Sequence, residues 1–196
     1  MVRKVAILVF DEVEVLDFCG PFEVFAVTGA PSEEKPFDVF TVAETAAPIT
    51  ARNGLSVNPN FTFADCPQAD ILIIPGGYGT RPLMHHQATL DWIKAQAANA
   101  ELVMSVCTGA LLLAKIGLLE GLTATTHWGA LDLLREVAPN TTIQSDTRFV
   151  DNGRVLLSAG ISAGIDLSFH IVARMLGREV AQETARWMEY DWKLPD

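Results

Sequence analysis

The chain has 196 residues, which suits one domain with a sizeable core, and we expect residues 1–196 to form a single domain. Apolar residues make up 49% and charged residues 19%, which excludes a disordered or fibrous protein. The formal net charge of -10 argues against nucleic acid and anionic membranes as partners, because both require a basic surface.

The cysteine and histidine patterns indicate which cellular compartment and which cofactors to expect. Cys19, Cys66 and Cys107 form no Cys-x-x-Cys pair, so neither a disulfide framework nor a zinc site is indicated, and a reducing cytoplasm fits best. The four histidines form no His-Glu-x-x-His pattern, so we expect no metal. The N-terminus enters a strand without the pattern of a signal peptide, and no apolar run approaches the ~20 residues of a membrane span.

Strand and helix patterns alternate along the chain. Apolar runs of strand length lie at 4–10, 37–43, 70–75, 101–106 and 122–126. Helical patterns lie at 21–27, 90–100, 109–115, 127–137, in a segment ending at 176, and at 179–190. This alternation predicts an α/β fold, a flavodoxin-like doubly wound, mostly parallel sheet with helices on both faces.

Two Asn-Gly pairs interrupt this alternation, and Asn-Gly is the strongest short-range hairpin signal. Arg52-Asn53-Gly54 predicts a small antiparallel hairpin within residues 48–63. Asp151-Asn152-Gly153 predicts a second hairpin turn, between two strand candidates in residues 141–159.

Cys107 lies between a buried strand and an Ala/Leu-rich helix, within residues 101–114. The carboxyl ends of parallel strands line the crevice where open α/β sheets bind ligands, so Cys107 faces that crevice. Gly109 lets the helix begin close to the strand, and the N–H groups of the first turn favour a thiolate. This arrangement is a nucleophile elbow with Cys in place of Ser. The alternative is that Cys107 is a small apolar filler.

Asp17 follows the first strand, just ahead of a helix that we expect Pro21 to open. In a parallel sheet that position shares an edge with Cys107. A carboxylate beside a thiolate would repel it, so an Asp17 close to Cys107 should be protonated, with a raised pKa, and donate to the sulfur. The alternative role of Asp17 is a helix N-cap.

Two further sites lie at predicted strand ends. Gly76 and Gly77 follow the strand at 70–75, and their backbone N–H groups could stabilise an oxyanion, the alternative being a tight turn. His127 ends the next predicted strand, with either a direct role or a structural hydrogen bond beneath the site. Asp166, in a first helical turn, is more typical of a cap or dipole partner than of a catalyst.

Together these residues resemble the ThiJ/PfpI branch of the class I glutamine amidotransferase-like superfamily, over essentially the full length. The segments that carry the resemblance are Leu16–Phe25, Pro75–Gly77, Ser105–Ala110, Ala124–Trp128 and Gly160–Asp166. Within the branch the chain looks like the isonitrile hydratases, which convert an isonitrile and water into an N-substituted formamide. The resemblance places that family's functional residues on Asp17, Cys107 and Thr108, and implies a small-molecule substrate, no cofactor and a homodimer.

Differences between this sequence and other members of the superfamily argue against several alternative activities. Protease-like members place His where this chain has Thr108, and glutaminases use a late His-x-Glu pair, whereas His170 is followed by Ile171. Regulators of the AraC type carry the same domain, but we expect no helix-turn-helix here. Stress-type members with aldehyde or glyoxal activity commonly have Glu in place of Asp17. A cysteine-based redox sensor, an aldehyde-processing enzyme and a non-catalytic ligand-binding remnant of a regulator remain the alternatives.

Overall fold

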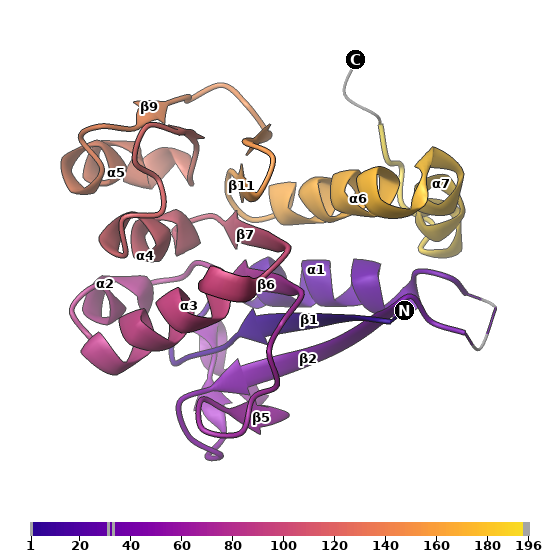
Figure 1. Cartoon of the computed structure of the whole chain (residues 1–196), viewed down its shortest axis with the longest axis horizontal. Coiled ribbons are helices and arrows are strands. Elements are labelled where there is room, and N and C mark those ends of the chain that lie inside the picture. The colour runs from indigo at the N-terminus through magenta and orange to yellow at the C-terminus, as the bar shows by residue number, and fades with distance from the viewer. Residues whose placement is uncertain (1, 31, 33, 194–196) are drawn as a thin grey trace.

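A seven-stranded sheet runs through the middle of the protein, in the order β10-β11-β7-β6-β1-β2-β5 (Figure 1). The computed structural model describes residues 2–30, 32 and 34–193. The strands of this sheet are β1 (Arg3–Leu8), β2 (Phe37–Ala43), β5 (Phe61–Thr62), β6 (Ile71–Ile74), β7 (Leu102–Val106), β10 (Phe149–Asp151) and β11 (Val155–Ser158). Neighbouring strands are parallel except for β10, which is antiparallel to β11. The expected mostly parallel sheet is confirmed.

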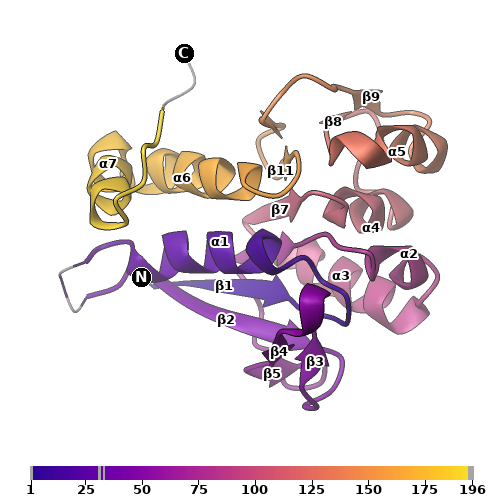
Figure 2. The ribbon, with the colours of Figure 1, turned by 180° about the vertical axis from the view of Figure 1, so that it is seen from behind.

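Helices cover both faces of the sheet, as the alternating pattern predicts. Figure 2 shows α1 on the near side of β1 and α3 on the far side. The helices are α1 (Val15–Val27), α2 (Thr80–Leu83), α3 (Gln87–Asn99), α4 (Gly109–Lys115), α5 (Leu131–Val137), α6 (Ala163–Leu176) and α7 (Arg178–Trp187). Helices α6 and α7 pack on each other and on α1, while α4 packs on α2 and α5. In the part of the chain that the structure describes, no helix is long and apolar enough to cross a bilayer.

Two small sheets lie outside the central one. β3 (Ile49–Thr50) and β4 (Ser56–Val57) form the expected antiparallel hairpin, closed by a 3-10 turn at Arg52–Gly54. Among the described residues, β8 (Thr123–Ala124) pairs with β9 (Thr142–Ile143) and does not join the central sheet. The prediction that His127 ends a strand of the central sheet is therefore wrong, because the apolar run before it pairs with a different partner.

The first helix begins earlier than Pro21 suggests. Helix α1 starts at Val15, its N-cap is Glu14, and Pro21 lies inside it. A proline inside a helix removes one backbone hydrogen bond, and burial of Pro21 with Phe18 and other core residues offsets that loss. Asp17 therefore belongs to the first turn of α1, and the alternative that it caps the helix is wrong.

The order of the strands creates a crevice between β1 and β6, because the chain proceeds from β1 to one side and from β6 to the other. The loops that leave these two strands are joined by backbone contacts. The N–H of Glu14 donates to the carbonyl of Gly76 at 2.9 Å, and Val13 forms a β-bridge with Gly77. These contacts bring the start of α1 to the glycines that follow β6.

Gly109→Ala should destabilise the fold, because a Cβ at this position would lie 1.9 Å from the carbonyl oxygen of Ile74. The obstacle is backbone and cannot rotate away, so we expect a loss of about 3 kcal/mol or more in the free energy of unfolding, measured by urea denaturation. The control is Gly129→Ala, whose Cβ would meet nothing nearer than the His127 ring at 3.4 Å. Equal stability of the two variants would contradict a close approach of α4 to β6.

Candidate active site

Cys107 occupies a tight turn between β7 and α4 and has a positive φ of 55°. Its N–H donates to the carbonyls of Ser158 and Ala159, each at 3.2 Å. Its own carbonyl accepts a hydrogen bond from the Thr126 hydroxyl at 2.7 Å. A non-glycine residue is rare in this backbone conformation, and these contacts from neighbouring segments hold it there. The backbone therefore has the geometry of a nucleophile elbow, and Cys107 is 6% exposed.

Asp17 is completely buried beside this elbow. Its Oδ2 accepts a hydrogen bond from the Gly76 N–H at 3.0 Å, while Oδ1 has no regular hydrogen-bond partner among the described residues. Burial raises the pKa of Asp17 to about 7, with a further contribution from the negative charge of Glu14. The Gly76 N–H and the Cys107 thiol act in the opposite direction, and their effect on the pKa is smaller. The direction of this shift agrees with the sequence prediction, but the cause is burial rather than a neighbouring thiolate, because the thiol lowers the pKa of Asp17.

Burial also raises the pKa of the Cys107 thiol, and the adjacent Asp17 charge raises it further. The N–H and hydroxyl of Thr108 lower the pKa, but they do not outweigh burial. The N–H groups at the start of the helix favour the thiolate, as expected, but the argument from the sequence omitted the larger opposing effect, the loss of solvent around the sulfur. A thiolate can form next to Asp17 only while that carboxyl holds a proton, since two adjacent anions repel.

The hydroxyl of Thr108 and the backbone of Gly77 hydrogen bond to each other, which links the elbow to the loop after β6. The Gly77 N–H donates to the Thr108 hydroxyl at 3.0 Å, and that hydroxyl donates to the Gly77 carbonyl at 3.1 Å. With the Gly76 N–H already bound to Asp17, neither glycine N–H is open to a substrate, and their expected oxyanion-binding role is not supported. A Cβ on Gly76 would lie 2.5 Å from the Thr108 nitrogen. The glycines instead allow the loops to approach closely enough to position Asp17 and Thr108.

A cavity of about 220 Å³ opens over Cys107. Its walls are Glu14, Arg52, Gly77, Tyr78, Arg81, Cys107, Thr108, His127 and Ile161. The sequence analysis did not assign Glu14, Arg52, Tyr78, Arg81 or Ile161 to the site. Arg81 lies in helix α2 and the others lie in loops or turns, and no spacing in the sequence signals that these segments converge.

His127 reaches this cavity although its strand lies outside the central sheet. Its Nδ1 accepts a hydrogen bond from the Gly129 N–H at 3.1 Å, which leaves the ring proton on Nε2. A Cβ on Gly160 would lie 2.2 Å from the ring, so this glycine makes room for the imidazole. His127 thus has a structural hydrogen bond and also lines the cavity beside Cys107.

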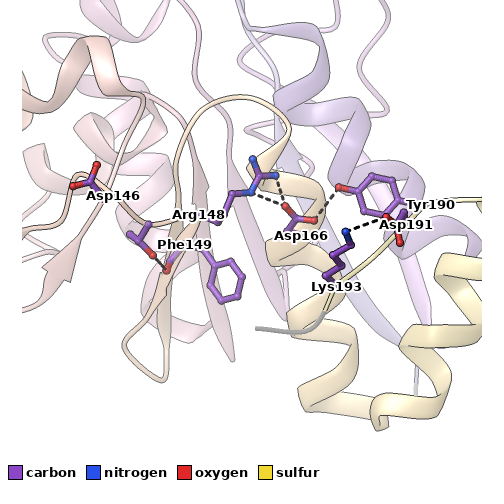
Figure 3. A pocket seen from close by; sticks show the side chains of 8 residues that line it. Asp146, Arg148, Phe149, Asp166, Tyr190, Asp191 and Lys193 are labelled. Carbon is purple, nitrogen blue, oxygen red and sulfur yellow. Dashed lines mark hydrogen bonds and ion pairs between the residues drawn. The ribbon is translucent and has the colours of Figure 1, made fainter. Parts of the chain in front are cut away.

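A second, larger cavity of about 600 Å³ lies near the C-terminal tail (Figure 3). Asp166 lines this cavity, where it forms an ion pair with Arg148 and accepts a hydrogen bond from the Tyr190 hydroxyl at 2.8 Å. Burial, together with Asp166, raises the pKa of Tyr190 to about 12. Its lining residues include no thiol or imidazole, and the charge of Asp166 is neutralised. Asp166 therefore joins α6 to β10 and to the tail, as a structural residue.

The protein is an α/β protein with a mostly parallel sheet, and a buried thiol on an elbow lies next to a buried carboxyl at the crevice of that sheet. The sequence comparisons identify its family. The chain belongs to the DJ-1/PfpI family, whose model matches residues 3–174.

Individual relatives refine this placement. The chain is 39% identical to isonitrile hydratase of Pseudomonas putida over 190 residues, which is 97% of this chain and 79% of that enzyme. It is 25% identical to the HTH-type transcriptional regulator GbdR of Pseudomonas aeruginosa over 96% of this chain, but spans only 51% of that regulator.

Solved structures agree with the fold. A ThiJ/PfpI family protein from Pseudomonas syringae is 30% identical, with a TM-score of 0.88, and the match covers 100% of this chain and 78% of that one. Drosophila melanogaster DJ-1beta has a TM-score of 0.82 at 18% identity, over 98% of this chain and 100% of that one, which shows a shared fold.

Asp17→Asn should stabilise the protein above neutral pH. The pKa of Asp17 rises from 3.8 to about 7 on folding, so its favourable contribution is fully present below pH 3.8 and is lost as the pH rises through 7. The amide has no charge to bury, so the variant should exceed the native protein by about 4 kcal/mol in the free energy of unfolding at pH 8 and nearly match it at pH 4.

Urea denaturation at both pH values measures this difference. Asp38→Asn, on an exposed position of β2, is the control and should change stability by no more than about 0.5 kcal/mol at either pH. If the Asp17→Asn protein is less stable than the native one at pH 8, burial of the ionised Asp17 does not lower the free energy of unfolding, which would contradict this account.

Proposed function

We propose that this protein is an isonitrile hydratase, a lyase that adds water to an isonitrile and releases an N-substituted formamide. The observation that carries the proposal is the Asp17 carboxyl, which is buried beside the Cys107 thiol, while Cys107 itself lines the cavity. The 39% identity to the Pseudomonas putida enzyme over 97% of the chain supports it. Addition to an isonitrile carbon requires a nucleophile, here the thiol, and a group that accepts the thiol proton and then delivers it, here the carboxyl.

In the first step, the Asp17 carboxylate accepts the thiol proton of Cys107 as the sulfur attacks the terminal isonitrile carbon. Asp17 then delivers this proton to the same carbon. A C–S bond and a C–H bond form, the S–H bond breaks, and the product is a thioimidate on Cys107. With a pKa of about 7, Asp17 is suited both to take and to give this proton near neutral pH.

In the second step, water attacks the thioimidate carbon while Asp17 removes one of the water's protons and passes it to the imine nitrogen. The tetrahedral species then collapses, so that the C–S bond breaks and the remaining hydroxyl proton returns to the sulfur. The formamide leaves and Cys107 is a thiol again. The protein needs no cofactor for either step.

Thr108 has a positioning role in this scheme. Its hydroxyl is bound to the backbone of Gly77, and Gly76 in turn holds Asp17, so Thr108 fixes the distance between the elbow and the carboxyl. His127, on the cavity wall, is a candidate contact for the substrate.

A peroxide sensor is the weaker interpretation. Oxidation of cysteine requires thiolate character and exposure, whereas Cys107 is buried and its pKa is raised. Stable sulfinic acid at Cys107 under mild peroxide, without hydratase turnover, would favour the sensor.

The assembly and the compartment are also proposals. We infer a homodimer in the cytoplasm with a small-molecule substrate. Of the C-terminal aromatic residues, Tyr190 and Trp192 pack on Phe169 of the same chain, while Trp187 is 56% exposed. Free Cys19, Cys66 and Cys107 suit a reducing compartment. Sedimentation equilibrium should give twice the chain mass of 21.3 kDa, and a single chain mass would contradict the dimer.

Purified protein should convert alkyl or aryl isonitriles into formamides, detected by proton NMR. Cys107→Ala should fall to the uncatalysed rate because no thioimidate can form, and Asp17→Asn should lose about 10²–10⁴-fold in kcat because the proton relay is removed. Cys66→Ala, which removes a half-buried thiol that does not line the cavity, is the matched control and should keep the native rate. Full activity of Cys107→Ala would overturn the mechanism.

A further inference from the structure

The side chains of Arg52, Tyr78 and Arg81 lie together in the cavity wall, where Tyr78 is exposed and the two arginines are half-buried. Arg52 comes from the turn between β3 and β4, and Arg81 comes from α2. The guanidinium carbon of Arg52 lies 3.8 Å from the centre of the Tyr78 ring, and that of Arg81 lies 5.7 Å from it. Because Tyr78 is 62% exposed, this group meets solvent where a substrate would enter.

The two arginines differ in their charge partners. Glu14, also on the cavity wall, lies 3.6 Å from Arg52 and neutralises it. Arg81 has no carboxylate partner in the described parts of the chain. Its Nη1 donates to the Gly77 carbonyl at 3.0 Å and to the Thr80 hydroxyl at 3.2 Å, and both acceptors are neutral. The cavity therefore has one uncompensated positive charge, in a chain of formal charge -10.

This charge is held in place and ready to bind an anion. The bonds to Gly77 and Thr80 use only one nitrogen of the Arg81 guanidinium, which orients the group without filling its donors. A planar guanidinium presents paired N–H groups that match a carboxylate, and a fixed one loses little entropy on binding. A partly buried cation without a partner is unfavourable, which a bound anion would correct.

We propose that Arg81 binds a carboxylate on the substrate, so that the protein prefers short isonitrile carboxylates over neutral isonitriles. This inference rests on the proposed function. Cys107 and Arg81 line the same cavity of about 220 Å³, below the roughly 300–1,000 Å³ typical of pockets for drug-sized ligands. The isonitrile carbon at the sulfur and the carboxylate at Arg81 are therefore separated by a chain of only a few atoms.

The test compares kcat/KM for a short isonitrile carboxylate with that for its primary amide, which has nearly the same size and no charge. We expect the native protein to prefer the carboxylate by about 10- to 100-fold, the range of one charge-assisted contact. In Arg81→Gln this ratio should fall to within about threefold of one. Arg178→Gln removes an exposed arginine at the start of α7 and is the matched control, in which the native ratio should persist.

A merely structural Arg81 would change both substrates together and leave their ratio intact, which would overturn the inference. A native ratio near one, with good turnover of both substrates, would also overturn it while leaving the hydratase function in place. Should Arg81→Gln fail to fold, the native protein still decides, because the preference must weaken as salt rises. No turnover of any isonitrile would instead refute the proposed function.

Discussion

The contact between the buried Asp17 carboxyl and the Cys107 thiol is the interaction on which this structure depends. A carboxyl removed from water holds its proton to higher pH, and burial likewise holds the proton on the sulfur. Burial of the ionised Asp17 is unfavourable above neutral pH, where an uncharged asparagine should be more stable. Such a cost is typical of a functional site, where stability is exchanged for reactivity.

The fold creates this contact by bringing three strand ends together. The loops after β1 and β6 are joined through Glu14 and Gly76, and the elbow after β7 is tied to the same glycines through Thr108. Each contact needs a residue without a side chain at the point of closest approach, which is why Gly76 and Gly109 stand where they do. Backbone packing thus sets the positions of Asp17, Cys107 and Thr108, and residues from other segments line the cavity above Cys107.

The sequence predicted the parts of this site that depend on local pattern. Apolar runs located the central strands, Asn53-Gly54 located the small hairpin, and the strand–Cys–Thr–Gly–helix pattern located the elbow. The sequence analysis failed for features that depend on contacts between segments far apart in the chain. Pro21 was misread as a helix start because burial of α1 outweighs the missing N–H of Pro21. The strand before His127 pairs with β9 instead of joining the central sheet. Arg81 has no local signature at all, since its importance comes from the charges around it.

Intact-protein mass spectrometry after rapid quenching tests the central claim most directly. During turnover of an isonitrile, the native protein should gain the mass of one substrate molecule on Cys107, since addition of the thiol loses no atoms. This adduct should disappear as the formamide accumulates. Formation of the formamide with no adduct at Cys107 at any time would show that water reaches the isonitrile without a covalent intermediate, and would contradict the account.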